Sequence, residues 1–184
     1  MPRTVAVFVG SLRKASFNRK IAHVLADLAP PELRLEIVEI VDLPLYNQDL
    51  DDEATPPAAW TAFREKVKPF HAVLFVTPEY NRSVPAVLKN ALDVGSRPYG
   101  QSVWDGKPGA VVSVSPGAIG GFGANHHLRQ SLVFLNVLTM QQPEAYIGGV
   151  GKLLDEAGQP ASAETSKFLG SIIAGFAAWV AKTR

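Results

Sequence analysis

Short apolar runs alternate along this sequence with segments of helical periodicity, and this alternation limits the possible folds more than any other feature. Residues 5–9, 72–76 and 110–114 are apolar almost without interruption, which predicts strands covered on both faces. A more polar alternation predicts an edge strand at 33–37, and a short fifth strand is expected within 139–147. Helical patterns follow the strands, at residues 18–28, 58–68, 84–94, 125–138 and 164–182. Five strand–helix units predict a parallel sheet with helices on both faces.

The loop after the first apolar run, residues 10–18, has the composition of a phosphate site. Ser11, Ser16 and Asn18 can donate hydrogen bonds, and Arg13 adds a planar cation. The helix expected from Asn18 onward would direct its first backbone N–H groups at the same ligand. The loop lacks the Gly-x-Gly-x-x-Gly pattern of dinucleotide sites and the Gly-Lys-Ser/Thr ending of ATP and GTP loops. It therefore predicts a site for a terminal monophosphate.

A phosphate loop directly after the first strand favours an α/β, flavodoxin-like three-layer sandwich with a five-stranded parallel sheet in the order 2-1-3-4-5. No internal repeat or linker interrupts the pattern, so residues 1–184 are expected to form a single domain. Residues 44–57 are polar and contain prolines, which predicts a long loop in which residues 49–53 form a solvated acidic patch. Ligands of such sheets bind at the carboxyl ends of the strands, so the loops after strands one, three and four form the expected site.

The loop after the third strand, residues 77–85, concentrates hydrogen-bonding groups. Glu79, Tyr80 and Asn81 stand in a row between two prolines. Such a loop suits the edge of a planar heterocycle, and a rigid turn with a capping serine is an equally compatible interpretation. Arg82 follows directly and could bind an anionic acceptor or the 2′-phosphate of NADPH, or lie in solvent.

The loop after the fourth strand is rich in glycine, with four glycines among residues 115–124. Glycine permits a positive φ and a close approach of the backbone to a ligand or a neighbouring segment. A long glycine-rich loop inside a compact domain is more often functional than a passive connection. Its backbone is therefore expected to face the same cleft as the other two loops.

The composition excludes several kinds of site and partner. The chain has a net charge of +1 and no cysteine, which argues against nucleic-acid binding and excludes disulfides and thiolate metal sites. The neighbouring His126 and His127 would point about 100° apart on a helix, so no metal is expected there.

The sequence starts with a strand pattern rather than a signal peptide, and its apolar C-terminal run is interrupted by small residues. A cytoplasmic protein without a membrane partner is expected. Trp60, Trp104 and Trp179 are expected to pack rather than to stack on a ligand.

Three motifs in this order resemble a known family. They are Gly10-Ser11-x-Arg13-x-x-Ser16-x-Asn18, Pro78-Glu79-Tyr80-Asn81, and Gly120-Gly121-Phe122-Gly123 ahead of Leu128-Arg129-Gln130. Together they resemble the NAD(P)H-dependent FMN reductases, in particular the bacterial chromate and quinone reductases. The resemblance extends from the first strand to about Gly149.

The resemblance implies a tightly bound FMN, with NADPH or NADH as co-substrate, and a homodimer or homotetramer. It also implies that hydride passes through N5 of the flavin, so no catalytic acid or base is expected. The acceptors would be quinones, free flavins, azo compounds or chromate. The cofactor contacts it implies are Ser11, Arg13, Ser16, Phe17, Asn18, Pro78, Glu79, Tyr80, Asn81, Ser115 and Gly117. Substrate contacts are expected from Arg82, Gly120 and Gly121.

Two alternatives to an enzyme stay open at this point. A flavodoxin-type electron carrier would share the fold and the cofactor, although such carriers are usually strongly acidic, unlike this chain. A binding module that has lost its flavin would share only the fold. A reductase oxidises NADPH when purified, whereas an electron carrier does not. A reductase is also yellow from bound flavin, whereas a binding module that has lost its flavin is colourless.

Overall fold

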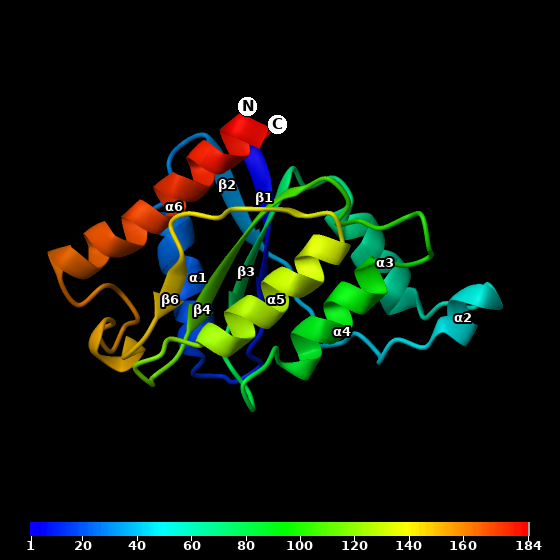
Figure 1. Cartoon of the computed structure of the whole chain (residues 1–184), viewed down its shortest axis with the longest axis horizontal. Helices are drawn as coiled ribbons and strands as arrows, with labels where there is room; N and C mark the ends of the chain where they lie inside the picture. The colour runs from blue at the N-terminus through cyan, green and yellow to red at the C-terminus, as the bar shows by residue number, and fades with distance from the viewer. Residues whose placement is uncertain (184) are drawn as a thin grey trace.

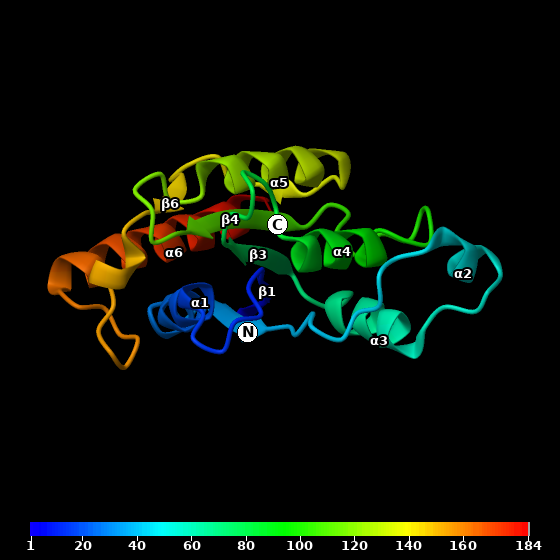
Figure 2. The ribbon, with the colours of Figure 1, turned by 90° about the horizontal axis from the view of Figure 1, so that it is seen from below.

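In the computed structural model, which describes residues 1–183, a parallel sheet lies between two layers of helices (Figures 1 and 2). Its strands are β1 (Arg3–Val9), β2 (Leu33–Ile37), β3 (Ala72–Thr77), β4 (Pro108–Val114), β5 (Leu138–Thr139) and β6 (Ala145–Ile147). The order β2-β1-β3-β4-β5 and the parallel pairing confirm the predicted flavodoxin-like topology. The predicted fifth strand is two short pieces, since β5 pairs with the start of β4 and β6 with its end.

Six α-helices and one short 3₁₀-helix complete the described part of the chain. They are α1 (Phe17–Asp27), α2 (Gln48–Asp52), α3 (Ala58–Val67), α4 (Ala86–Gly95), α5 (Phe122–Phe134), α6 (Ala163–Thr183) and the 3₁₀-helix η1 (Val150–Lys152). Figure 2 shows α1 and α6 on one face of the sheet and α3, α4 and α5 on the other. No helix within residues 1–183 is long and apolar enough to cross a membrane.

The alternation of side chains along the strands explains why the strand sequences are apolar throughout. In β1, Val5 and Val7 pack toward α1 and α6, whereas Ala6 and Phe8 pack toward α3, α4 and α5. The second face has an aromatic core in which the Phe8 ring lies 5.4 Å from Phe75 and 5.2 Å from Trp104. Trp60 and Trp104 are fully buried, which confirms their predicted packing role.

The prediction of a loop at residues 44–57 was wrong in one respect, because this segment contains α2. Asp51 is also not part of a solvated patch. Its carboxylate accepts two hydrogen bonds from Arg64 on α3, at 2.8 and 2.7 Å, and its side chain is only 4% exposed. Arg64 Nε donates in addition to the Val94 carbonyl at 2.9 Å, so this ion pair connects α2 with α3 and α4.

The helix predicted over residues 125–138 is displaced toward the N-terminus, as α5 (Phe122–Phe134). It starts early because Gly121 adopts a left-handed conformation, with φ of 75°, directly before the first helical residue. It ends early because the chain leaves the helix at Leu135, and Asn136 then has a φ of 55°.

Candidate functional site

The three predicted loops lie together at one edge of the sheet. The parallel register places Val9 beside Val76 and Thr77 beside Ser113, so β1, β3 and β4 end next to one another. Their connections to α1, α4 and α5 form the lower edge of the molecule in Figure 1, opposite both termini. The three loops therefore meet at one edge of the sheet, as the strand order predicted, and their sharing of one ligand site stays a prediction.

The first loop provides a buried polar cradle at the start of α1. Ser11, Ser16 and Asn18 are 3%, 3% and 5% exposed. Ser16 caps the helix, because its Oγ accepts a hydrogen bond from the Arg19 amide at 3.2 Å, and its own hydroxyl hydrogen remains available to a ligand. The Asn18 Oδ1 atom is buried without a hydrogen-bond partner among the described residues.

These features fit a phosphate group. The first turn of α1 contains no acidic side chain, and its leading N–H groups have no carbonyl partner within the helix. Arg13, on the same loop, is exposed. A phosphate offers only acceptor oxygens, so it would pair with the Asn18 Nδ2 donor and not with the unpartnered Oδ1.

The second loop is a tight hairpin. Tyr80 and Ser83 exchange two backbone hydrogen bonds, at 3.1 and 2.9 Å. Asn81 and Arg82 between them have φ of 50° and 64°, the two successive positive values of a type I′ turn. Arginine rarely adopts this conformation, so the surrounding structure must hold it. The turn leaves the Tyr80 side chain half exposed and the Arg82 side chain 76% exposed.

Glu79 is turned away from solvent, toward α5. Its Oε2 accepts a hydrogen bond from the Ala124 amide at 3.0 Å, and its Oε1 lies 3.3 Å from Arg82 Nη1. The side chain is 12% exposed. The family resemblance implied that Glu79 contacts the cofactor but did not indicate this contact with α5, because nothing in the local pattern shows which loop reaches the start of that helix.

In the third loop the glycines permit close packing between segments. A Cβ atom on Gly120 would lie 2.7 Å from the Tyr146 carbonyl carbon, and one on Gly121 would lie 3.1 Å from the Ser113 Cβ. The substrate contacts of these two glycines stay a prediction. Gly117 differs, since a Cβ there would meet only the Ser115 Oγ, at 3.4 Å. Ser115 Oγ accepts from the Gly117 amide at 3.0 Å and holds this open part of the loop in place.

The two histidines of α5 diverge. His126 Nε2 lies 2.9 Å from the Tyr146 hydroxyl, whereas His127 Nδ1 lies 3.0 Å from the Ser83 hydroxyl. Burial and then a hydrogen bond with Glu144 raise the pKa of Tyr146 above its ordinary value, so its phenol is protonated at neutral pH. Within residues 1–183, no three His, Cys, Asp or Glu side chains are grouped to hold a metal ion.

Arg129 belongs to a buried polar network that the motif alone did not reveal. Its Nε donates to Asn125 Oδ1 at 2.8 Å, and its Nη1 donates to the Met140 carbonyl at 2.8 Å. Asn125 is fully buried and its Nδ2 lies 3.2 Å from the Ser113 Oγ. Arg129 therefore fixes α5 against the segment that follows β5, and its Nη2 is buried without a hydrogen-bond partner among the described residues.

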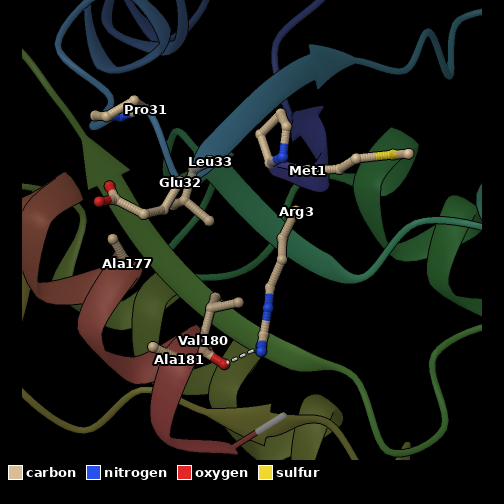
Figure 3. A pocket seen from close by; sticks show the side chains of 9 residues that line it. Met1, Arg3, Pro31, Glu32, Leu33, Ala177, Val180 and Ala181 are labelled. Carbon is tan, nitrogen blue, oxygen red and sulfur yellow. Dashed lines mark hydrogen bonds between the residues drawn. The ribbon is translucent and has the colours of Figure 1, made fainter.

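A hollow of about 550 Å³ opens at the other edge of the sheet, where β1 and β2 begin (Figure 3). It is lined by Arg3, Leu33, Ala177 and Val180 among others. Its arginine is already engaged, because Arg3 Nη1 donates to the Val180 carbonyl at 2.7 Å. The hollow lies away from the three loops and is not the candidate site.

Comparison with known proteins identifies similar sequences and a similar structure. The family model described as NADPH-dependent FMN reductase matches residues 3–152. A quinone reductase of Pseudomonas putida is 64% identical over 98% of this chain and 96% of its own. A 2-hydroxy-1,4-benzoquinone reductase of a Burkholderia species is 47% identical over the full length of both chains. The solved structure of FerB, a flavoenzyme NAD(P)H:(acceptor) oxidoreductase of Paracoccus denitrificans, has a TM-score of 0.90 and 42% identity over 98% of each chain.

Proposed function

Since this chain belongs to the NADPH-dependent FMN reductase family, we propose that it holds FMN at the three loops and transfers two electrons from NADPH or NADH to a quinone. The family match and the relatives confirm the predicted oxidoreductase class, with FMN as cofactor and NAD(P)H as co-substrate. The specific acceptor and the residues that hold each ligand are the proposal. We also propose that residues 1–184 form a single FMN-binding domain.

The observation that carries the proposal is the cradle at the start of α1. Ser11, Ser16 and Asn18 would donate to the FMN phosphate from their buried positions, and Arg13 would neutralise its charge. Phe17, the first residue of α1, would cover the ribityl chain beside them. Bound FMN supplies the chemistry, because its ring system accepts and donates hydride.

The second and third loops would hold the flavin ring. Pro78, Tyr80 and Asn81 would contact the ring along a hairpin whose geometry is fixed by the two Tyr80–Ser83 backbone hydrogen bonds, while the Glu79 side chain is engaged with α5. On the third loop, Ser115 and Gly117 provide the open stretch of backbone. No residue is assigned as a general acid or base.

The exposed side chains around the loops favour an apolar, planar acceptor. Each loop exposes a large hydrophobic residue: Leu12 on the first, Tyr80 on the second, and Ile119 and Phe122 at the third. A quinone, a free flavin or an azo compound can pack on such a rim. Chromate is a small anion and would depend on Arg82, the exposed cation of the second loop.

The protein is further proposed to act in the cytoplasm as a dimer or tetramer. Large apolar side chains lie exposed at the far ends of α4 and α5, where Tyr99, Val133 and Phe134 are 85%, 75% and 77% exposed. Burying such residues favours self-association. Light scattering would then give at least twice the chain mass of 19.8 kDa.

The assignment of Arg13 is tested by titrating FMN into the flavin-free protein. Arg13→Ala is expected to weaken FMN binding by about tenfold or more, since a hydrogen bond to a charged group contributes about 1.5–3 kcal/mol. Lys14→Ala is the matched control, because it removes a neighbouring exposed cation of the same loop. Equal affinities of wild type and Arg13→Ala would exclude the role given to Arg13.

A further inference from the structure

The start of α5 is capped by a residue from another loop. Its N-cap, Gly121, has no side chain with which to satisfy the amides of the first turn. The Ala124 amide is instead bound by the Glu79 carboxylate at 3.0 Å, a contact between residues 45 positions apart. A carboxylate at a helix N-terminus is also favoured by the helix dipole.

Two more contacts hold the second loop against the first turns of α5. The Ser83 Oγ lies 3.0 Å from His127 Nδ1. The Arg82 carbonyl oxygen lies so close to Gly123 that a Cβ atom there would be only 2.8 Å away. The type I′ hairpin therefore packs against α5 at three positions, and Glu79 provides a charged contact whose side chain is only 12% exposed.

We propose that Glu79 is a positioning residue that clamps the second loop to the third and so sets the width of the flavin cleft. This inference rests on the proposed function, because it concerns the two loops assigned to the flavin ring. The Glu79 carboxylate contacts neither the phosphate cradle nor the exposed rim. It acts through the Ala124 amide and the Arg82 guanidinium, and the position of the hairpin follows from these contacts.

The test compares three variants as flavin-free proteins into which FMN is titrated. Glu79→Ala removes the clamp and is expected to weaken FMN binding about tenfold or more. Glu79→Gln keeps an oxygen for the Ala124 amide but loses the charge, so its affinity is expected within about fivefold of wild type. Lys107→Met is the control for general destabilisation, because Lys107 lies at the opposite end of β4, buried against the end of α3.

A second readout does not depend on flavin. Hydrogen exchange of the Ala124 amide in the flavin-free protein is expected to be about tenfold faster in Glu79→Ala than in wild type or Lys107→Met.

The outcomes separate this inference from the proposed function. If wild type binds FMN and Glu79→Ala binds it equally well, or no more weakly than Lys107→Met does, the clamp is refuted while the proposed function stands. Glu79→Gln as weak as Glu79→Ala would refute the capping contact. A wild type that binds no FMN would instead overturn the proposed function.

Discussion

Lys107 offers a quantitative test of how the scaffold holds the end of α3. Its side chain is 6% exposed, and its ammonium group donates to three backbone carbonyls, of Val67, Lys68 and Phe70, at 3.3, 2.8 and 2.5 Å. These carbonyls lie at and just beyond the C-terminus of α3, where helical acceptors lack partners. Lys107→Met retains most of the aliphatic stem and removes only the charged donor.

The expected loss follows from two opposing terms. Hydrogen bonds to a charged group contribute about 1.5–3 kcal/mol each, so three such bonds would give a large sum. The buried ammonium loses hydration worth several kcal/mol, which the methionine does not lose. The net destabilisation is therefore expected at about 2–4 kcal/mol. For a chain of this length, that corresponds to a fall in Tm of about 4–16 °C.

Urea unfolding of the flavin-free protein measures this loss without a contribution from ligand binding. Lys68→Met is the matched control, because the Lys68 side chain is exposed and only its carbonyl takes part in the contact. The control is expected to stay within about 0.5 kcal/mol of wild type. A Lys107→Met variant as stable as wild type would show that the three carbonyl contacts do not stabilise the folded state.

Three further predictions address the ion pair and the catalytic cycle. Hydrogen bonds from Arg64 hold the pKa of Asp51 below its ordinary value, so this pair stabilises the fold above about pH 4, and the contribution is lost as pH falls through the folded-state pKa. Asp51→Asn should lower stability in urea unfolding by about 1.5–3 kcal/mol at pH 7 and by less at pH 2, and an equal loss at both values would contradict this. Arg82→Ala should raise KM for NADPH by about tenfold and leave KM for NADH unchanged if Arg82 binds the 2′-phosphate, whereas equal changes would remove that role. If the three loops provide a single site, donor and quinone should bind there alternately and the double-reciprocal lines should be parallel. Intersecting lines would require a second site.

The sheet and the location of the site could be predicted because both depend on local patterns. A strand covered on both faces must be apolar throughout, as in residues 72–76. The loops that follow parallel strands must all begin at the same edge of the sheet. The polar cradle was predictable for the same reason, since Ser16 and Asn18 adjoin the start of a helix in sequence.

The remaining features depend on contacts between distant residues. The α2 helix is held by the Asp51–Arg64 pair, and no periodicity in five residues could reveal it. The N-terminus of α5 is capped by Glu79 from another loop, and the glycines before it fit against Tyr146 and Ser113. The sequence showed that this loop was rich in glycine, but the segments that require the glycines became visible only in the folded chain.

FMN bound by the three loops is expected to be reduced by NAD(P)H and reoxidised by a quinone. The most direct measurement follows flavin absorbance of the purified protein, reconstituted with FMN, under anaerobic conditions. Addition of one equivalent of NADPH or NADH is expected to bleach the oxidised flavin band, and one equivalent of benzoquinone is expected to restore it. A protein that binds FMN but keeps its oxidised spectrum with both nucleotides would behave as an electron carrier and would contradict the account.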